Sequence, residues 1–175
     1  VTGMFSIGDW RWTNDPVGYF YNSGGQPVNS KYEVVDQIGG PDHAKVKLLT
    51  DGVKVGGAAQ TTAALGTKVR LSKDLHFGVD WNLFARNYAD WAFATSDLAM
   101  DKEVPYSTPW RIPSANTFDF NASYSFNIGN LKAVLSGNVN NVFDQEYISS
   151  AVDGSKHDYD SAYRVFYGFG HTMSM

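Results

Sequence analysis

No cysteine occurs among the 175 residues, which excludes a disulfide framework and any metal site built on thiolates. No run of apolar residues approaches the roughly 18 that a membrane-spanning helix needs. Lys and Arg form no cluster and the formal net charge is −4, so we expect no nucleic-acid partner. Charged residues make up 18% of the chain, less than the roughly 25% of an average domain. These absences leave a sparsely charged chain with neither disulfides nor spanning helices.

Catalytic motifs are absent as well. The sequence contains no H-E-x-x-H, no G-x-S-x-G and no phosphate-binding glycine loop. The four histidines show no spacing typical of metal ligands; they are His43, His76, His157 and His171. We therefore expect no catalytic residue, no metal and no cofactor, and we do not expect an enzyme.

The first ten residues, VTGMFSIGDW, lack both the basic stretch and the cleavage site of a signal peptide. They also lack an initiator methionine. We expect the chain to be a piece of a longer protein.

What the sequence does contain is a repeated alternation of apolar and polar residues. In FDFNASYSFNI, residues 118–128, every second residue is apolar, which is the period of a β-strand with one apolar face. Six segments alternate in this way, at about 1–14, 59–71, 75–89, 118–128, 131–143 and 161–175. The pattern predicts an all-β, antiparallel fold.

Charges in these segments fall on the polar face and not on the apolar one. The seven that define this face are Lys68, Arg70, Asp80, Arg86, Asp119, Lys132 and Arg164. A midplane Arg or Lys facing lipid costs roughly 2–4 kcal/mol, so a lipid-facing surface must stay free of charge. The segregation predicts that the apolar face contacts lipid and that the seven charges face the lumen of a barrel. There we expect Arg86, Lys132 and Arg164 to pair with Asp80 and Asp119 or to be hydrated.

Segment length and connection length indicate the same fold. A tilted membrane strand needs about 9–11 residues, whereas a strand in a globular domain typically has about five or six. Short turns, at 72–74 and 129–130, alternate with three long connections, at about 15–57, 90–116 and 149–160. Outer-membrane barrels have short periplasmic turns and longer extracellular loops. The sequence thus predicts a transmembrane β-barrel segment.

Four stretches resemble the C-terminal part of TonB-dependent outer-membrane receptors, most closely Bacteroidetes versions of the siderophore-receptor type. They are GMFSIGDWRW (3–12), GGAAQTTAALG (56–66), NVNNVFDQEYI (138–148) and RVFYGFGHTMSM (164–175). The block NVNNVFDQEY is the most specific, and we expect its Asn and Asp residues to form side-chain turns where the fifth strand ends. The family usually ends on an aromatic residue, whereas this sequence stops at Met175.

The resemblance implies a barrel of about 22 strands, closed by an N-terminal plug domain that contacts the energy-transducing protein TonB. Residues 1–175 would be the last six strands of that barrel domain, without the plug. The implied activity is TonB-dependent uptake of a scarce large solute, a ferric siderophore, across the outer membrane of a Gram-negative bacterium. The implied partners are outer-membrane lipid, the plug, TonB and the solute.

Four residues are predicted to bind ligand on the extracellular side: Trp10, Trp12, Trp110 and Arg111. The tryptophans are also typical of an aromatic girdle at the membrane interface, and that alternative stays open. Two other functions also stay open. One is a passive porin-like channel, and the other is a soluble all-β carbohydrate-binding module that uses the tryptophans as stacking platforms.

Overall fold

Four of the six predicted segments form long strands in the computed structural model, which describes residues 1–91 and 98–175. They are β4 (Thr61–Arg70), β5 (Leu75–Ala85), β9 (Ala115–Ile128) and β10 (Leu131–Asn140). These strands have 10, 11, 14 and 10 residues, so each reaches the length that a tilted membrane strand needs. The first segment forms only a short strand, β1 (Thr2–Ile7).

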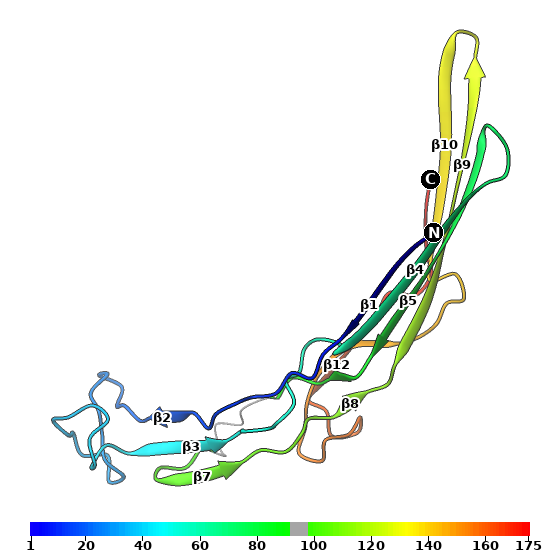
Figure 1. Ribbon diagram of the computed structural model, residues 1–175. Coiled ribbons are helices and arrows are strands. Elements are labelled where there is room, and N and C mark those ends of the chain that lie inside the picture. The colour runs from blue at the N-terminus through cyan, green and yellow to red at the C-terminus, as the bar shows by residue number, and fades with distance from the viewer. Residues whose placement is uncertain (92–97) are drawn as a thin grey trace. The chain divides into compact units, whose positions relative to one another are not determined.

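These strands form one antiparallel sheet of six, in the order β1-β4-β5-β9-β10-β13, where β13 is Thr172–Ser174 (Figure 1). Each long strand therefore pairs with the next one along the chain. The tight turns 71–74 and 129–130 lie at one end of this meander, and the three long connections leave from the other end. The predicted alternation of short and long connections is present in the structure.

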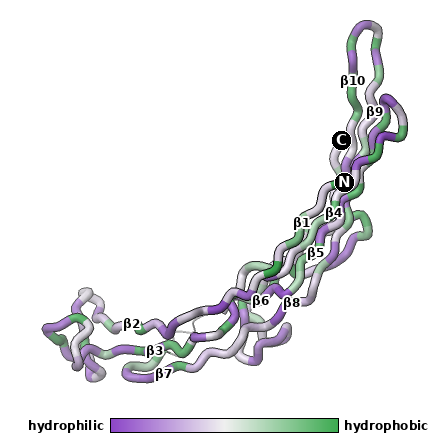
Figure 2. The backbone as a smooth tube through the Cα atoms, viewed as in Figure 1, coloured by the Kyte–Doolittle hydropathy of each residue, from purple (hydrophilic) through white to green (hydrophobic). Residues whose placement is uncertain are grey.

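The register places the apolar residues of neighbouring strands opposite one another. Leu65 pairs with Trp81, which pairs with Phe118, while Tyr124 pairs with Leu135. Figure 2 shows hydrophobic and hydrophilic residues alternating along β9 and β10. In β1, β4, β5, β9 and β10, the face that contains Leu65 carries no Asp, Glu, Lys or Arg. We call this surface the apolar face of the sheet, and the opposite surface its polar face.

The sixth predicted segment is wrong as a single strand. Residues Arg164–Tyr167 form β12, which pairs with β11 (Ile148–Val152) in a separate two-stranded sheet. Only Thr172–Ser174 joins the six-stranded sheet. Gly168 and Gly170 lie in the interruption, and the missing side chain of Gly168 leaves room for the ring of Tyr147. Glycine weakens a strand interior and permits such a close approach.

The third predicted segment also ends early. Arg86 has a positive φ of 54°, which ends β5 at Ala85. The next residues, Asn87–Tyr88, form β6 and pair with β8 (Arg111–Ile112). A small core of Ala89, Ile112 and Ala151 lies beside these short strands.

The described residues form two units, which we describe separately. The sheet unit comprises Val1–Asp9, Gly56–Asp90 and Trp110–Met175; the loop unit comprises Trp10–Val55 and Trp91–Pro109. In the loop unit, β2 (Val17–Tyr19), β3 (Lys45–Leu49) and β7 (Lys102–Pro105) form a sheet of three strands. The pairing of β3 with β7 is parallel.

A buried histidine organises the core of the loop unit. His43 is 1% exposed, accepts the Gly39 N–H at Nδ1 over 2.9 Å and lies 2.8 Å from the Phe20 carbonyl oxygen through Nε2. Since Nδ1 accepts, Nε2 carries the proton and donates to that carbonyl. The ring also stacks on Tyr19, with centroids 4.8 Å apart. Both ring nitrogens are therefore used in holding the fold.

The predicted all-β class is confirmed for the part of the chain that the structure describes, where no helix occurs. Accordingly, no helix in this part is long and apolar enough to cross a membrane. None of the four sheets closes into a barrel. The transmembrane barrel therefore stays a prediction.

Candidate functional site

The centre of the polar face carries two carboxylates directly opposite each other. Asp80 on β5 pairs in register with Asp119 on β9. Asn121 donates its Nδ2–H to Asp80 Oδ2, and Asn82 donates its Nδ2–H to Asp119 Oδ2, each over 3.2 Å. Gly78, the register partner of Asn121, leaves the room that the Asn121 side chain occupies. The result is an acidic centre that is hydrogen-bonded by carboxamides.

The predicted cations of the polar face lie away from this centre. Lys68, Arg70 and Lys132 are on the polar face towards the tight turns. Arg70 donates from Nε to Nε2 of His76 over 3.2 Å. No ion pair to Asp80 or Asp119 occurs among residues 1–91 and 98–175, so the predicted pairing of these acids is not observed there.

Two other predicted polar-face residues lie outside the six-stranded sheet. Arg86 follows β5 and its Nη2 lies 3.9 Å from Asp9 Oδ1. Arg164 lies on β12, opposite Val152 of β11. The prediction for Arg86 extends a period of two beyond the end of β5 at Ala85. The prediction for Arg164 treats 161–175 as one strand, whereas β12 and β13 are separate strands in different sheets.

The NVNNVFDQ block ties three parts of the sheet unit together. Asn141 is 4% exposed, and its N–H donates to Asp119 Oδ1 over 2.8 Å. Its side chain accepts the Gln145 N–H and donates to the carbonyl oxygens of Gln145 and Phe169. Asp144 accepts the His171 N–H over 2.9 Å. The expected side-chain turns are present, at residues with φ values of 47° and 50° that Asn and Asp tolerate.

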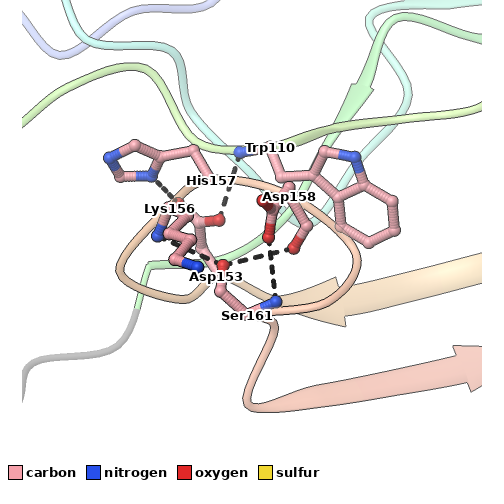
Figure 3. A network of polar contacts seen from close by, with 6 residues as sticks. All are labelled: Trp110, Asp153, Lys156, His157, Asp158 and Ser161. Carbon is pink, nitrogen blue, oxygen red and sulfur yellow. Dashed lines mark hydrogen bonds and ion pairs between the residues drawn. The ribbon is translucent and has the colours of Figure 1, made fainter.

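A second polar network surrounds Trp110 (Figure 3). Asp153 is buried and accepts the backbone N–H of Trp110 at Oδ1 over 3.2 Å, while its Oδ2 lies 2.6 Å from Nδ1 of His157. The carboxylate of Asp158 accepts the Ser161 backbone N–H over 2.8 Å, while the Ser161 hydroxyl donates to the Asp158 carbonyl oxygen over 3.5 Å. Hydrogen bonding with the side chain and backbone of Ser161 holds the pKa of the Asp158 carboxyl below its usual range. This network fixes the loop 153–161 beside Trp110.

The structure gives Trp110 a packing role. Its ring meets that of Tyr159 edge-on, with centroids 5.9 Å apart, and it packs against the core of Ala89, Ile112 and Ala151. Arg111 next to it is exposed. In the loop unit, Trp10 and Trp12 are 47% and 39% exposed, and Trp12 meets Trp91 edge-on. The four predicted ligand-binding residues are thus divided between the two units, and no single described site contains them all.

A recess that was not predicted lies on the polar face, at the end from which the long connections leave. Its volume is about 370 Å³, and its lining includes Asn82, Thr117, Asp119 and Asn140 together with Phe84, Tyr147 and Phe169. The alternation predicts Asn82, Asp119 and Asn140 on the polar face, where the structure has them. Tyr147 lies outside the predicted segments. The alternation in segment 161–175 predicts Phe169 on the apolar face, and this is wrong, because residue 169 lies in the interruption between β12 and β13. Among the described residues, no three acidic or histidine side chains gather as a metal site would require.

No family model, no curated protein and no solved structure matches the chain. The resemblance to TonB-dependent receptors therefore stays a prediction.

Proposed function

We propose that the sheet unit is part of the wall of a TonB-dependent transporter in the outer membrane of a Gram-negative bacterium. In this role the apolar face contacts lipid and the polar face lines the lumen. The long connections contribute to ligand capture on the extracellular side. A plug domain and TonB, supplied outside this chain, drive the import of a large solute, for which a ferric siderophore is our proposal. The chain itself makes and breaks no bonds.

The observation that carries the proposal is the uncharged, exposed apolar face. Phe5, Leu65, Tyr124 and Leu135 are 68%, 49%, 48% and 53% exposed. All four lie on the face without charged residues. Large contiguous apolar surfaces are rare on soluble monomers and mark membrane or protein contact sites. A lipid environment accounts for both the exposure and the complete segregation of charge.

The lengths and connections of the strands support the same proposal. The strand β9 has 14 residues and its neighbours have 10 or 11. The hairpins at one end have tight turns, whereas the opposite end carries all the long connections. A passive porin-like channel would share these features, and an upstream plug domain in the intact gene product would separate it from the active transporter.

Two neighbouring pairs of residues provide a matched test of the lipid contact. Leu135 and Tyr124 are opposite each other on the apolar face, while Ser136 and Ser123 are opposite each other on the polar face. We expect Leu135→Arg or Tyr124→Arg to cost roughly 2–4 kcal/mol near the midplane, and Ser136→Arg or Ser123→Arg to cost much less. The measurement is the amount of folded, heat-modifiable protein in outer membranes, with each substitution made in the intact gene product.

Depth dependence separates lipid from a protein core. Leu131 lies on the same apolar face as Leu135 but next to the tight turn. In a bilayer the cost of Arg falls to about 0–1 kcal/mol near the interface, so Leu131→Arg should be milder than Leu135→Arg. Equal loss at Leu135 and Ser136, or a folded protein that stays in the soluble fraction, would refute the lipid contact. The soluble result would favour the carbohydrate-binding module.

A further inference from the structure

The recess on the polar face has hydrogen-bond acceptors without matching donors. Asn82 gives one Nδ2–H to Asp119, and Asn140 gives one to the hydroxyl of Thr172 over 3.1 Å. The side-chain carbonyl oxygens of Asn82 and Asn140 accept no hydrogen bond from the described residues. The recess therefore presents two carbonyl oxygens that are open to water or to the N–H groups of a ligand.

A largely buried threonine also lines the recess without a hydrogen-bond partner among the described residues. Thr117 is 8% exposed and lines the recess, and its side chain makes no hydrogen bond within residues 1–91 and 98–175. The hydroxyl oxygen itself is not fully buried, so it is open to a group in the recess. The recess therefore offers this hydroxyl, together with the two carbonyl oxygens, to the N–H groups of a ligand.

The charge of the recess is negative and uncompensated. Asp119 lines it, and Asp80 lies directly opposite on the neighbouring strand. Like charges at such positions destabilise a sheet. Two cations that border β4 and β5 have other neighbours, since Arg86 is paired with Asp9 and Arg70 donates to His76. A bound cation with N–H groups would relieve this repulsion and donate hydrogen bonds to the open acceptors of the recess.

Aromatic rings complete the lining. Phe84, Tyr147 and Phe169 border the same recess. The faces of aromatic rings attract organic cations, so these rings favour a guanidinium or alkylammonium group over a hydrated metal ion. The volume of about 370 Å³ admits such a group with a short carbon chain.

We propose that this recess binds the guanidinium or primary ammonium group of an organic molecule. Asp119 is its counter-ion, and Thr117 and Asn82 accept its N–H groups. The proposal uses residues of the sheet unit alone, and it is tested separately from the lipid contact and from transport.

The test compares two probes of nearly equal shape, butylguanidinium and the uncharged butylurea, on the 175-residue chain. The chain is held in a detergent with an uncharged headgroup, which avoids a competing cation. Amide chemical shifts of Thr117 and Tyr147 report binding. We expect butylguanidinium to bind at least tenfold more tightly than butylurea, because a charge-assisted hydrogen bond is about twice as strong as a neutral one. Equal affinity, or no shift with either probe, would overturn the proposal.

Three variants locate the site. Asp119→Asn keeps the shape and should weaken butylguanidinium binding at least tenfold, and Thr117→Val should weaken it about threefold. Asp74→Asn removes the same charge from the β4–β5 turn at the other end of β5 and should have no effect. Contacts between the paired residues Asn82 and Thr117 verify the sheet register in each variant. Unchanged binding in both Asp119→Asn and Thr117→Val, or an equal loss in Asp74→Asn, would refute the site.

A capped peptide with one central arginine, titrated in the same way, distinguishes the source of the cation. Tighter binding of the peptide than of butylguanidinium assigns the recess to a polypeptide side chain, and weaker binding assigns it to a free solute. Either result supports an organic cation.

Discussion

At the scale of single residues, the hydrogen bonds of Asp144 couple its charge to the fold. Its carboxylate accepts the backbone N–H of His171 over 2.9 Å, and the His171 ring lies beside it with Nδ1 at 3.5 Å. The backbone hydrogen bond, with a smaller contribution from the histidine ring, lowers the pKa of Asp144. Since hydrogen bonding favours the charged form, protonation must weaken the attachment of residue 171 to the NVNNVFDQ block.

We predict an acid-side loss of stability that depends on Asp144. A group with a lowered pKa in the folded state contributes stability that is present above its unfolded value, about 3.9 for Asp, and is lost as the pH falls through the folded value. The difference in unfolding free energy between the wild type and Asp144→Asn should therefore shrink as the pH is lowered through this window. Urea unfolding at several pH values measures it. Taking the difference removes the contributions of Asp15 and Asp158, whose pKa values are also lowered. A pH-independent difference, or a carboxyl of Asp144 that titrates as in a peptide, would contradict the assignment.

At the scale of structural elements, Asn141 joins the end of β10 to β9 and to the segment that precedes β13. Its backbone N–H reaches Asp119, and its side chain reaches Gln145 and Phe169. These bonds are made by a residue that is 4% exposed and has a φ of 47°. Few other residues can adopt this backbone conformation and satisfy all three partners.

We predict that Asn141→Ala destabilises the sheet unit by about 2–3 kcal/mol, because it removes three part-buried side-chain hydrogen bonds and places alanine at a positive φ. The matched control is Asn138→Ala on the same strand. Among the described residues, the side chain of Asn138 makes one long hydrogen bond, from Nδ2 to Ser174 Oγ over 3.3 Å. Its loss should cost less than about 1 kcal/mol. Urea unfolding measures both, and a cost for Asn141→Ala no greater than that for Asn138→Ala would refute the junction role.

The long strands could be predicted because their pattern repeats over many residues. In β4, β5, β9 and β10 one face is apolar throughout, so the strand period and the register both follow from burial of that face. The turns at Asn141 and Asp144 could be predicted because Asn and Asp side chains bond to nearby backbone. The same alternation predicts that Asn82, Asp119 and Asn140, which line the recess, lie on the polar face.

The remainder of the fold depends on contacts that a local pattern does not record. The strands of the loop unit have three to five residues, too few for a period of two to stand out. The break in the sixth segment depends on Gly168, over which Tyr147 packs, and on Gly170, which lies close to Asp144.

The loop unit also contains a repeated local turn signal that a period of two does not detect. Asn22 and Asn29 each accept two backbone N–H groups and bond to a Gln or Glu four residues later, giving two turns with the sequence N-S-x-x-[QE].

At the scale of the whole molecule, the six-stranded sheet has an exposed apolar face and two open edges. Within the described residues β1 pairs with β4 alone, so its other edge has no partner. β10 pairs with β13 only at Asn138, Val139 and Asn140, which leaves the part from Leu131 to Gly137 open on that side. Unpaired N–H and C=O groups along an edge are a template for another strand. In a bilayer such groups must be satisfied by protein, so the proposed function requires neighbouring strands at both edges.

We predict that the 175-residue chain by itself associates in plain buffer and becomes monodisperse only with detergent or lipid. Detergent covers the apolar face, while the edges stay available to further strands. Light scattering coupled to gel filtration, with and without a non-ionic detergent, measures the outcome. The substitutions Leu135→Lys and Tyr124→Lys, in the middle of the apolar face, should raise the solubility of the chain in buffer. The substitutions Ser136→Lys and Ser123→Lys, at neighbouring positions on the polar face, should change its solubility little. A monodisperse monomer in plain buffer, with a sharp cooperative melting transition, would show that the apolar face is covered by protein. The carbohydrate-binding module would then replace the transporter wall as the proposed function.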